Sequence, residues 1–169
     1  NPHVLLYNTG EILTDGYISN NGIELEAKII NADLQSFGIK KDVGSGTCNI
    51  NASVLGNLEE PDVDGYLWSN DIVVMDMPIN SVKTEFHIKK DILGVAPLVI
   101  RPVDGSIIDG YTTINLKNAR IESARINFQQ LCLDLFRPFI PQTIASKGLD
   151  GVFKGYATYN RNNGKKENT

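Results

Sequence analysis

The sequence predicts an all-β fold with one or two short helical turns. In about ten segments apolar and polar residues alternate, which is the pattern of a strand with one buried and one solvent-exposed face. In the clearest segment Val82, Thr84, Phe86 and Ile88 point one way and the residues between them the other. Turn signals such as residues 20–22 (Asn-Asn-Gly) separate the segments. No long helical pattern occurs, which excludes a βαβ fold because its parallel strands need helical crossovers.

Strands are predicted in chain order from this alternation. Met77 and Pro78 are expected to interrupt the sheet, and Pro97 predicts a bent or unpaired edge. The strand that opens at Ile121 changes phase at Ser123. The predicted strands cover residues 4–7, 11–19, 23–29, 48–54, 63–74, 82–89, 93–100, 108–117, 121–128 and 151–159.

Two segments break the alternation and predict helical structure. Residues 31–38 fit a single helical turn, with Asp33 near its start and Gly38 as its stop. Residues 129–136 (QQLCLDLF) place apolar side chains at helical spacing and are followed by prolines. This second segment is the best helix candidate, about two turns long.

Composition excludes two classes of protein. The 169 residues carry a net charge of −4 and no basic run longer than two lysines, whereas a nucleic-acid groove needs a cationic face. No apolar stretch reaches the ~18 residues that a membrane-spanning helix requires. Because both ends look cut, we expect residues 1–169 to be a single fragment of a longer repetitive β-groove domain.

The sequence offers no case for an enzyme. His3 and His87 have no Ser, Cys or Asp partner at an interpretable spacing, so no nucleophile–base arrangement is visible. The Asp-Gly pairs lack the spacing of a calcium loop and are turn signals. Cys48 and Cys132 form no metal pattern, and composition leaves open whether they are bridged. We therefore expect no catalytic residues, no metal and no cofactor.

An internal repeat is predicted between residues 4–60 and 99–164. Residues 10–17 (GEILTDGY) resemble residues 105–111 (GSIIDGY), and Ala27-Lys-Ile29 resembles Ala124-Arg-Ile126. The period is about a hundred residues, and repetition of this kind implies an elongated array whose units stack on their neighbours.

The apolar faces need a partner, and two arrangements supply one. A closed sandwich would bury them against a second sheet. A curved sheet would instead form an open trough, about 45 Å long for ten strands, which a soluble protein avoids exposing unless it binds something. A hydrocarbon chain suits such a trough, because burying each CH₂ contributes roughly 0.8 kcal/mol.

Several short motifs follow one another in a recognisable order along the chain. One set runs from Ser45-Gly46 to Pro61 and Gly65. The others are Met77-Pro78 with Ile79 and Val82, then Pro97-Leu98, residues 105–110, and the segments Asp33-Leu34 and Gln130-Leu131. Taken together, their order and spacing resemble the repeated β region of TamB and AsmA-like proteins of the diderm bacterial envelope, and the resemblance covers residues 10–164.

The resemblance implies an elongated curved sheet, a β-taco with an open, greasy groove and a polar exterior. It also implies an inner-membrane anchor elsewhere in the chain and transport of phospholipid between the inner and outer membranes, across the periplasm. For the family it further implies a link to outer-membrane protein assembly with an Omp85-type partner, bound by a region outside this chain. The expected groove lining is Ile50, Ala52, Val54, Val82, Phe86, Ile88, Ile114, Leu116, Ile126 and Phe128.

Two rival functions remain open. A β-sandwich binding or adhesion module would have a closed, dry core and no lipid. A right-handed β-helix enzyme acting on polysaccharide would show clustered carboxylates on one face and coils of twenty-odd residues. The period near a hundred residues and the lack of acidic clusters argue against the β-helix.

Overall fold

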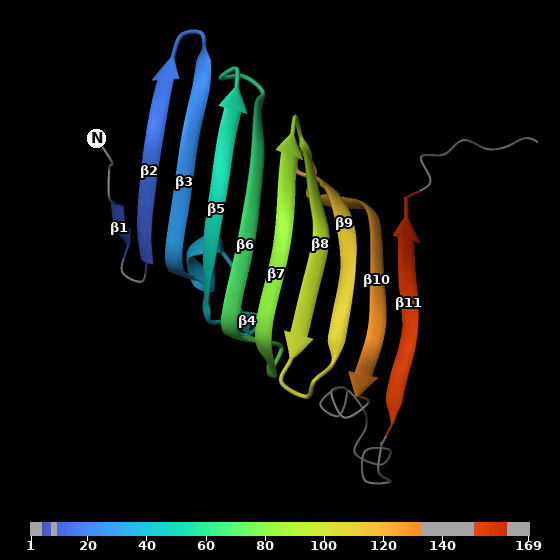
Figure 1. The fold of residues 1–169 in the computed structure, drawn as a ribbon. Coiled ribbons are helices and arrows are strands. Elements are labelled where there is room, and N and C mark those ends of the chain that lie inside the picture. The colour runs from blue at the N-terminus through green and yellow to red at the C-terminus, as the bar shows by residue number, and fades with distance from the viewer. Residues whose placement is uncertain (1–4, 8–9, 133–150, 162–169) are drawn as a thin grey trace, which may run out of the picture.

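A computed structural model describes residues 5–7, 10–132 and 151–161, and these form one open antiparallel sheet (Figure 1). The strands follow one another across the sheet in the order β1-β2-β3-β5-β6-β7-β8-β9-β10-β11, with the short β4 paired to one end of β6. The sheet is elongated and curved and does not close on itself, as the sequence predicts. The strands are β1 (Leu5–Tyr7), β2 (Gly10–Ser19), β3 (Gly22–Asp33), β4 (Gly44–Ser45), β5 (Thr47–Gly56), β6 (Pro61–Val74), β7 (Met77–Lys89), β8 (Ile92–Pro102), β9 (Ile107–Asn115), β10 (Arg120–Cys132) and β11 (Val152–Asn160).

Short turns join most neighbouring strands. Residues 20–21 connect β2 to β3, as the Asn-Asn-Gly signal predicts. Met75 and Asp76 connect β6 to β7, and both have positive φ, 49° and 64°, as a two-residue hairpin turn requires. The break between these strands therefore falls before Met77, and Pro78 lies inside β7 rather than interrupting the sheet.

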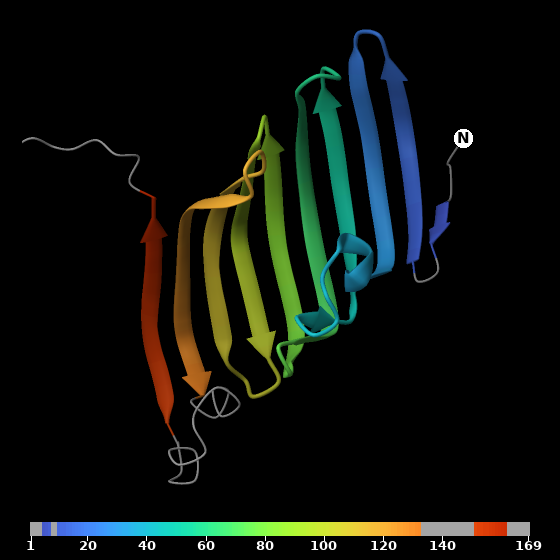
Figure 2. The ribbon, with the colours of Figure 1, turned by 180° about the vertical axis from the view of Figure 1, so that it is seen from behind.

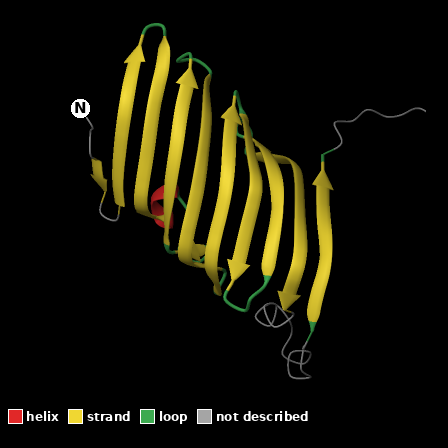
Figure 3. Cartoon of the chain, in the orientation of Figure 1, coloured by secondary structure: helices red, strands yellow, loops and turns green. Residues whose placement is uncertain are grey.

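The helical turn predicted over residues 31–38 is confirmed as the 3₁₀ segment η1, Leu34–Phe37. The Asp33 carboxylate accepts a hydrogen bond from the Gln35 N–H at 2.9 Å, and Gly38 ends the turn with φ 79°. Figures 2 and 3 show η1 at one end of the sheet, between β3 and β5. In the part of the chain that the structure describes, no helix is long and apolar enough to cross a bilayer.

The helix predicted over residues 129–136 is wrong for the part that can be compared. Strand β10 continues to Cys132, where Leu131 pairs with Phe153 and Cys132 with Val152 of β11. A register shift after Phe128 inserts one extra residue, which breaks the alternation and produces the apparent helical spacing. Residues 133–136 lie outside the described residues.

Strand β8 is also placed differently from the prediction. It lies inside the sheet between β7 and β9, not at an unpaired edge. Pro97 lies at a bulge of β8, where the pairing with both neighbouring strands is interrupted. On the β9 side the paired residues jump from Val95 to Leu98, and on the β7 side the register shifts at the same place. Such a bulge accommodates a residue that cannot donate to a ladder. The phase change predicted at Ser123 is confirmed as a bulge after Ile121.

The predicted repeat stays a prediction. Its two halves contain β2-β3-β5 and β9-β10-β11, each a hairpin followed by a longer connection to a third strand. Their registers differ at the matched glycines, however, because Gly16 pairs with Leu25 whereas Gly110 pairs with Ile126.

Candidate functional site

One face of the sheet is apolar from end to end. Residues that are direct partners across an antiparallel ladder project to the same face, so the register defines the members of each face. One cross-strand row on this face runs Gly16, Leu25, Val54, Val63, Ile88, Leu93, Ile114, Ile121. A second row runs Ile12, Ile29, Ile50, Leu67, Thr84, Leu98, Gly110, Ile126, Ala157. We call this surface the apolar face.

The structure places the predicted lining residues on this apolar face, with one exception. Ile50, Ala52, Val54, Val82, Phe86, Ile88, Ile114, Ile126 and Phe128 share it through the ladder partners of β5, β7, β9 and β10. Leu116 does not, because β9 ends at Asn115 and Leu116 begins the following turn. Its N–H donates to the Asp91 carbonyl at 2.7 Å, and its side chain is 45% exposed.

The apolar face is only half-buried. Ile50 and Val54 keep partial exposure, although each has apolar partners on both adjoining strands. Val82 and Phe86 are also partly exposed, and their partners on β6 are Ser69 and Gly65. Buried members of the face include Ala32 and Cys48, at the end of the strands near η1. Within residues 5–7, 10–132 and 151–161, no second sheet packs on this face.

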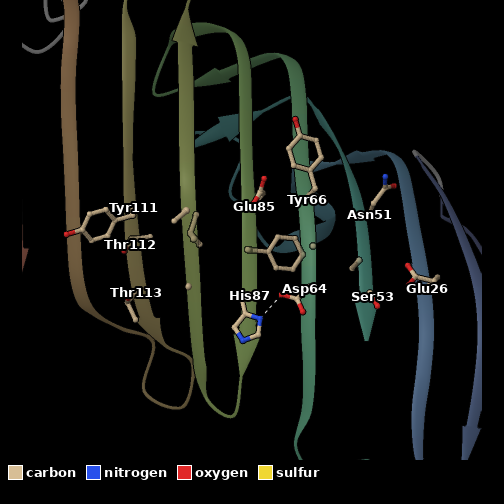
Figure 4. Close-up of a pocket in the computed structure, with 16 residues that line it drawn as sticks. Glu26, Asn51, Ser53, Asp64, Tyr66, Glu85, His87, Tyr111, Thr112 and Thr113 are labelled. Carbon is tan, nitrogen blue, oxygen red and sulfur yellow. Dashed lines mark hydrogen bonds and ion pairs between the residues drawn. The ribbon is translucent and has the colours of Figure 1, made fainter. Parts of the chain in front are cut away.

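The opposite face is polar and carries a hollow of about 710 Å³. Its lining comes from β3, β5, β6, β7, β8 and β9, as Figure 4 shows. Residues of the polar face surround it, among them Asn51, Asp64, Tyr66, Glu85 and His87. The residues between them in sequence also line it, namely Ala52, Gly65, Phe86, Val95 and Thr112. The hollow therefore crosses the sheet on its polar face, and the sequence did not predict it.

His87 has an acidic partner that the sequence interpretation missed. Its Nδ1 lies 2.6 Å from Asp64 Oδ1, and the two side chains are 47% and 68% exposed. The missed signal was the position of the turn. Once Met75-Asp76 is the hairpin turn, residues whose numbers sum to 151 are partners, which places Asp64 opposite His87. Among the described residues, no hydroxyl or thiol bonds to His87, so the pair forms no nucleophile–base arrangement.

Other cross-strand pairs stabilise the polar face. Lys89 Nζ lies 2.8 Å from Asp62, and the hydrogen bond and charge of that carboxylate raise the pKa of Lys89. Tyr17 donates to Glu24 at 2.8 Å, and this hydrogen bond raises the pKa of the Tyr17 phenol. These groups are exposed, so we assign them to the solvated exterior of the sheet.

Among the described residues, neither the cysteines nor the acidic residues form a metal centre. Cys48 and Cys132 are free, and they lie on β5 and β10, which four strands separate. At about 4.8 Å per strand their separation is roughly 24 Å, far beyond the ~7 Å limit for a disulfide. The described residues contain no group of three or more His, Cys, Asp or Glu suited to a metal ion.

The two faces thus divide the chemistry of the sheet: one is mainly apolar, with a few hydroxyl side chains such as Thr84, and the other carries the polar hollow. Comparisons with protein-family models, with curated proteins and with solved structures found no match to this chain.

Proposed function

We propose that the apolar face binds the acyl chains of phospholipid and that the chain is a lipid-carrying segment of a larger envelope protein. One observation carries the proposal: a cross-strand row that is apolar except at Thr84 runs from β2 to β11, and no second sheet among the described residues packs on it. β2 and β11 stand at opposite sides of the sheet, so the face extends on the order of 40 Å.

The energetics favour a hydrocarbon ligand. An exposed apolar patch larger than a few hundred Å² marks a binding surface in most soluble proteins. Each methylene that leaves water for this face contributes roughly 0.8 kcal/mol, and the contribution needs no directional partner. The face has few polar groups to recognise a headgroup, so it would bind the tail and leave the headgroup at its rim.

The alternative is a β-sandwich adhesion module with a closed, dry core. That module needs a second sheet over the apolar face, and the described residues supply one sheet only. The single-layer arrangement therefore supports lipid binding better than it supports a dry core.

The cellular setting follows from the resemblance to TamB and AsmA-like proteins. On that basis we place the segment in the periplasm of a diderm bacterium, in a protein that is anchored in the inner membrane outside this chain. Its cargo would be phospholipid that moves between the two membranes. An Omp85-type partner would bind another region of that protein.

The test compares the same charge on the two faces of one strand. Val82→Asp and Phe86→Asp place a carboxylate on the apolar face, whereas Lys83→Asp places one on the polar face beside them. We expect phospholipid to copurify with the wild-type chain, as measured by native mass spectrometry and lipid extraction. A carboxylate without a partner in an acyl site costs at least about 1–3 kcal/mol, so the two apolar-face variants should bind at least about tenfold more weakly.

Lys83→Asp should bind phospholipid as the wild type does, and circular dichroism should show that every variant keeps its sheet. A folded, delipidated chain that takes up no fluorescent phospholipid from vesicles would refute the proposal. An equal loss with Lys83→Asp would also refute it, since the effect would then be independent of the face.

A further inference from the structure

The hollow on the polar face is elongated and runs across the strands. Two cross-strand rows of polar-face residues form its walls, and Figure 4 shows them as two lines of side chains. The first wall contains Asn51, Tyr66, Glu85 and Tyr111. The second wall contains Glu26, Ser53, Asp64, His87, Gly94 and Thr113. From β5 to β9 the hollow crosses four strand spacings, which amounts to about 19 Å.

The floor of the hollow is backbone, because the residues between the two walls project their side chains to the apolar face. These residues form one ladder row, namely Ala52, Gly65, Phe86, Val95 and Thr112. The second wall is lowest at Gly94, where an added Cβ would meet only the His87 carbonyl, at 3.8 Å. A ligand can therefore lie against the floor between the two rows of side chains.

Two exposed tyrosine rings belong to the first wall. Tyr66 is 36% exposed and Tyr111 is 47% exposed. The Tyr66 ring stacks on Trp68, with centroids 5.6 Å apart and 24° between the planes, and this contact limits its movement. Because β6 and β9 are three strand spacings apart, the two tyrosines lie about 14 Å from each other along the hollow. The wall thus offers two aromatic surfaces to a long ligand.

The remaining side chains supply hydrogen-bonding groups. Asp64 and His87 bond to each other through Oδ1 and Nδ1, at 2.6 Å, which leaves Oδ2 and Nε2 for a ligand. Glu85 adds a second carboxylate, and Asn51 adds an amide that both donates and accepts. The lining includes three carboxylates and no lysine or arginine, so it repels phosphate and other anions.

We propose that the hollow binds a linear, uncharged oligosaccharide that lies across the strands. A pyranose ring has apolar C–H faces that stack on an aromatic ring, and hydroxyl groups at its edge that pair with carboxylate, amide and imidazole groups. Tyr66 and Tyr111 would each stack on one sugar, and Asp64, His87 and Glu85 would bind hydroxyls between them. This site does not depend on lipid binding, because it lies on the opposite face of the sheet.

The first test titrates the 169-residue chain with cellotetraose and with tetra-N-acetylchitotetraose in a calorimeter. We expect at least one of the two sugars to bind with a millimolar dissociation constant or a lower one. Tyr66→Ala and Tyr111→Ala remove a stacking surface and should weaken binding about tenfold, whereas Tyr66→Phe keeps the ring and should bind nearly as the wild type does. Tyr17→Ala is the matched control, because Tyr17 is an exposed tyrosine of β2 outside the hollow.

The second test separates a blocked site and a charged ligand from the proposed one. Gly94→Leu fills the hollow from its floor and should abolish sugar binding, with circular dichroism to show that the sheet is kept. Asp64→Asn/Glu85→Gln removes two charges but keeps hydrogen-bonding groups, so it should weaken sugar binding far less than Tyr66→Ala does. Spermine, a linear polycation, tests for a cationic ligand. Binding of neither sugar to the folded chain, equal binding by Tyr66→Ala, or tighter binding of spermine than of both sugars would overturn the proposal.

Discussion

The ring of Phe86 lies directly on Gly65 of the neighbouring strand. The two residues are ladder partners, and a Cβ added to Gly65 would lie 2.1 Å from Phe86 Cζ. Glycine thus leaves a slot that the aromatic ring fills on the apolar face. Within β11, the Phe153 ring likewise lies over Gly155, two residues along the same strand, with 2.6 Å from the added Cβ to Cζ. Each ring covers the strand backbone where the glycine has no side chain of its own.

Gly65→Ala should therefore displace the Phe86 ring and destabilise the sheet by about 1–3 kcal/mol, as inserted methyl groups do in packed sites. Urea unfolding followed by circular dichroism measures the change. The matched control is Gly94→Ala in β8, where the added Cβ meets only the His87 carbonyl at 3.8 Å. That variant should be neutral or slightly stabilising, because glycine is a poor strand residue. Equal destabilisation of both variants would contradict the contact described above.

Gly110→Ala should destabilise the protein more than Gly65→Ala. Here the added Cβ would lie 2.1 Å from the Arg125 carbonyl oxygen and 3.2 Å from Ile126 Cα, both of which are backbone atoms of β10. A side chain can rotate away, whereas a paired strand can move only by breaking its ladder. Thermal unfolding should give a lower Tm for Gly110→Ala, and a Tm equal to that of the Gly94→Ala control would count against this packing.

Leu131→Ala should cost about 2–5 kcal/mol, the usual range for a buried leucine. Leu131 is 2% exposed and pairs with Phe153 at the end of β10. Leu55→Ala is the control, because Leu55 is 47% exposed in β5 and should cost far less. Denaturant midpoints of the two variants test whether residues 129–132 pack as a strand. Similar midpoints would argue against the end of β10 as described.

The two cysteines should react with thiol reagents at different rates. Cys48 is 2% exposed, and burial raises the pKa of its thiol, so less thiolate forms below that pKa. Cys132 is more accessible and should be alkylated first at pH 8, as peptide mass spectrometry would show. Raising the pH should speed the reaction of Cys48 by forming more thiolate. Oxidation should leave no disulfide within a chain; a Cys48–Cys132 bridge would require a different sheet.

The alternation along each strand was enough to predict the class of fold and which side chains share a face. Ile50, Ala52 and Val54, and likewise Val82, Phe86 and Ile88, follow from period two within one strand. The prediction that Leu116 shares the apolar face was wrong, because the alternation continues past the end of β9 into a turn. In the turn no ladder fixes the direction of the side chain. The prediction of a helix was wrong over residues 129–132, because the bulge in β10 spaces the apolar residues as a helix would.

The partner of each strand required the tertiary structure. Asp64 and His87 are 23 residues apart, and only the position of the Met75-Asp76 turn sets them opposite each other. A turn displaced by one residue would place Asp64 beside a different neighbour. Local propensity does not distinguish such registers, whereas the burial of a whole face does.

By itself the sequence determined that this chain forms strands with one apolar and one polar side, because apolar and polar residues alternate with a period of two along the backbone. The tertiary structure decided that the described strands lie in a single open layer and that their apolar sides align in rows across the sheet. The physical reason is that sheet order and register depend on hydrogen bonds between distant segments, which no local pattern encodes.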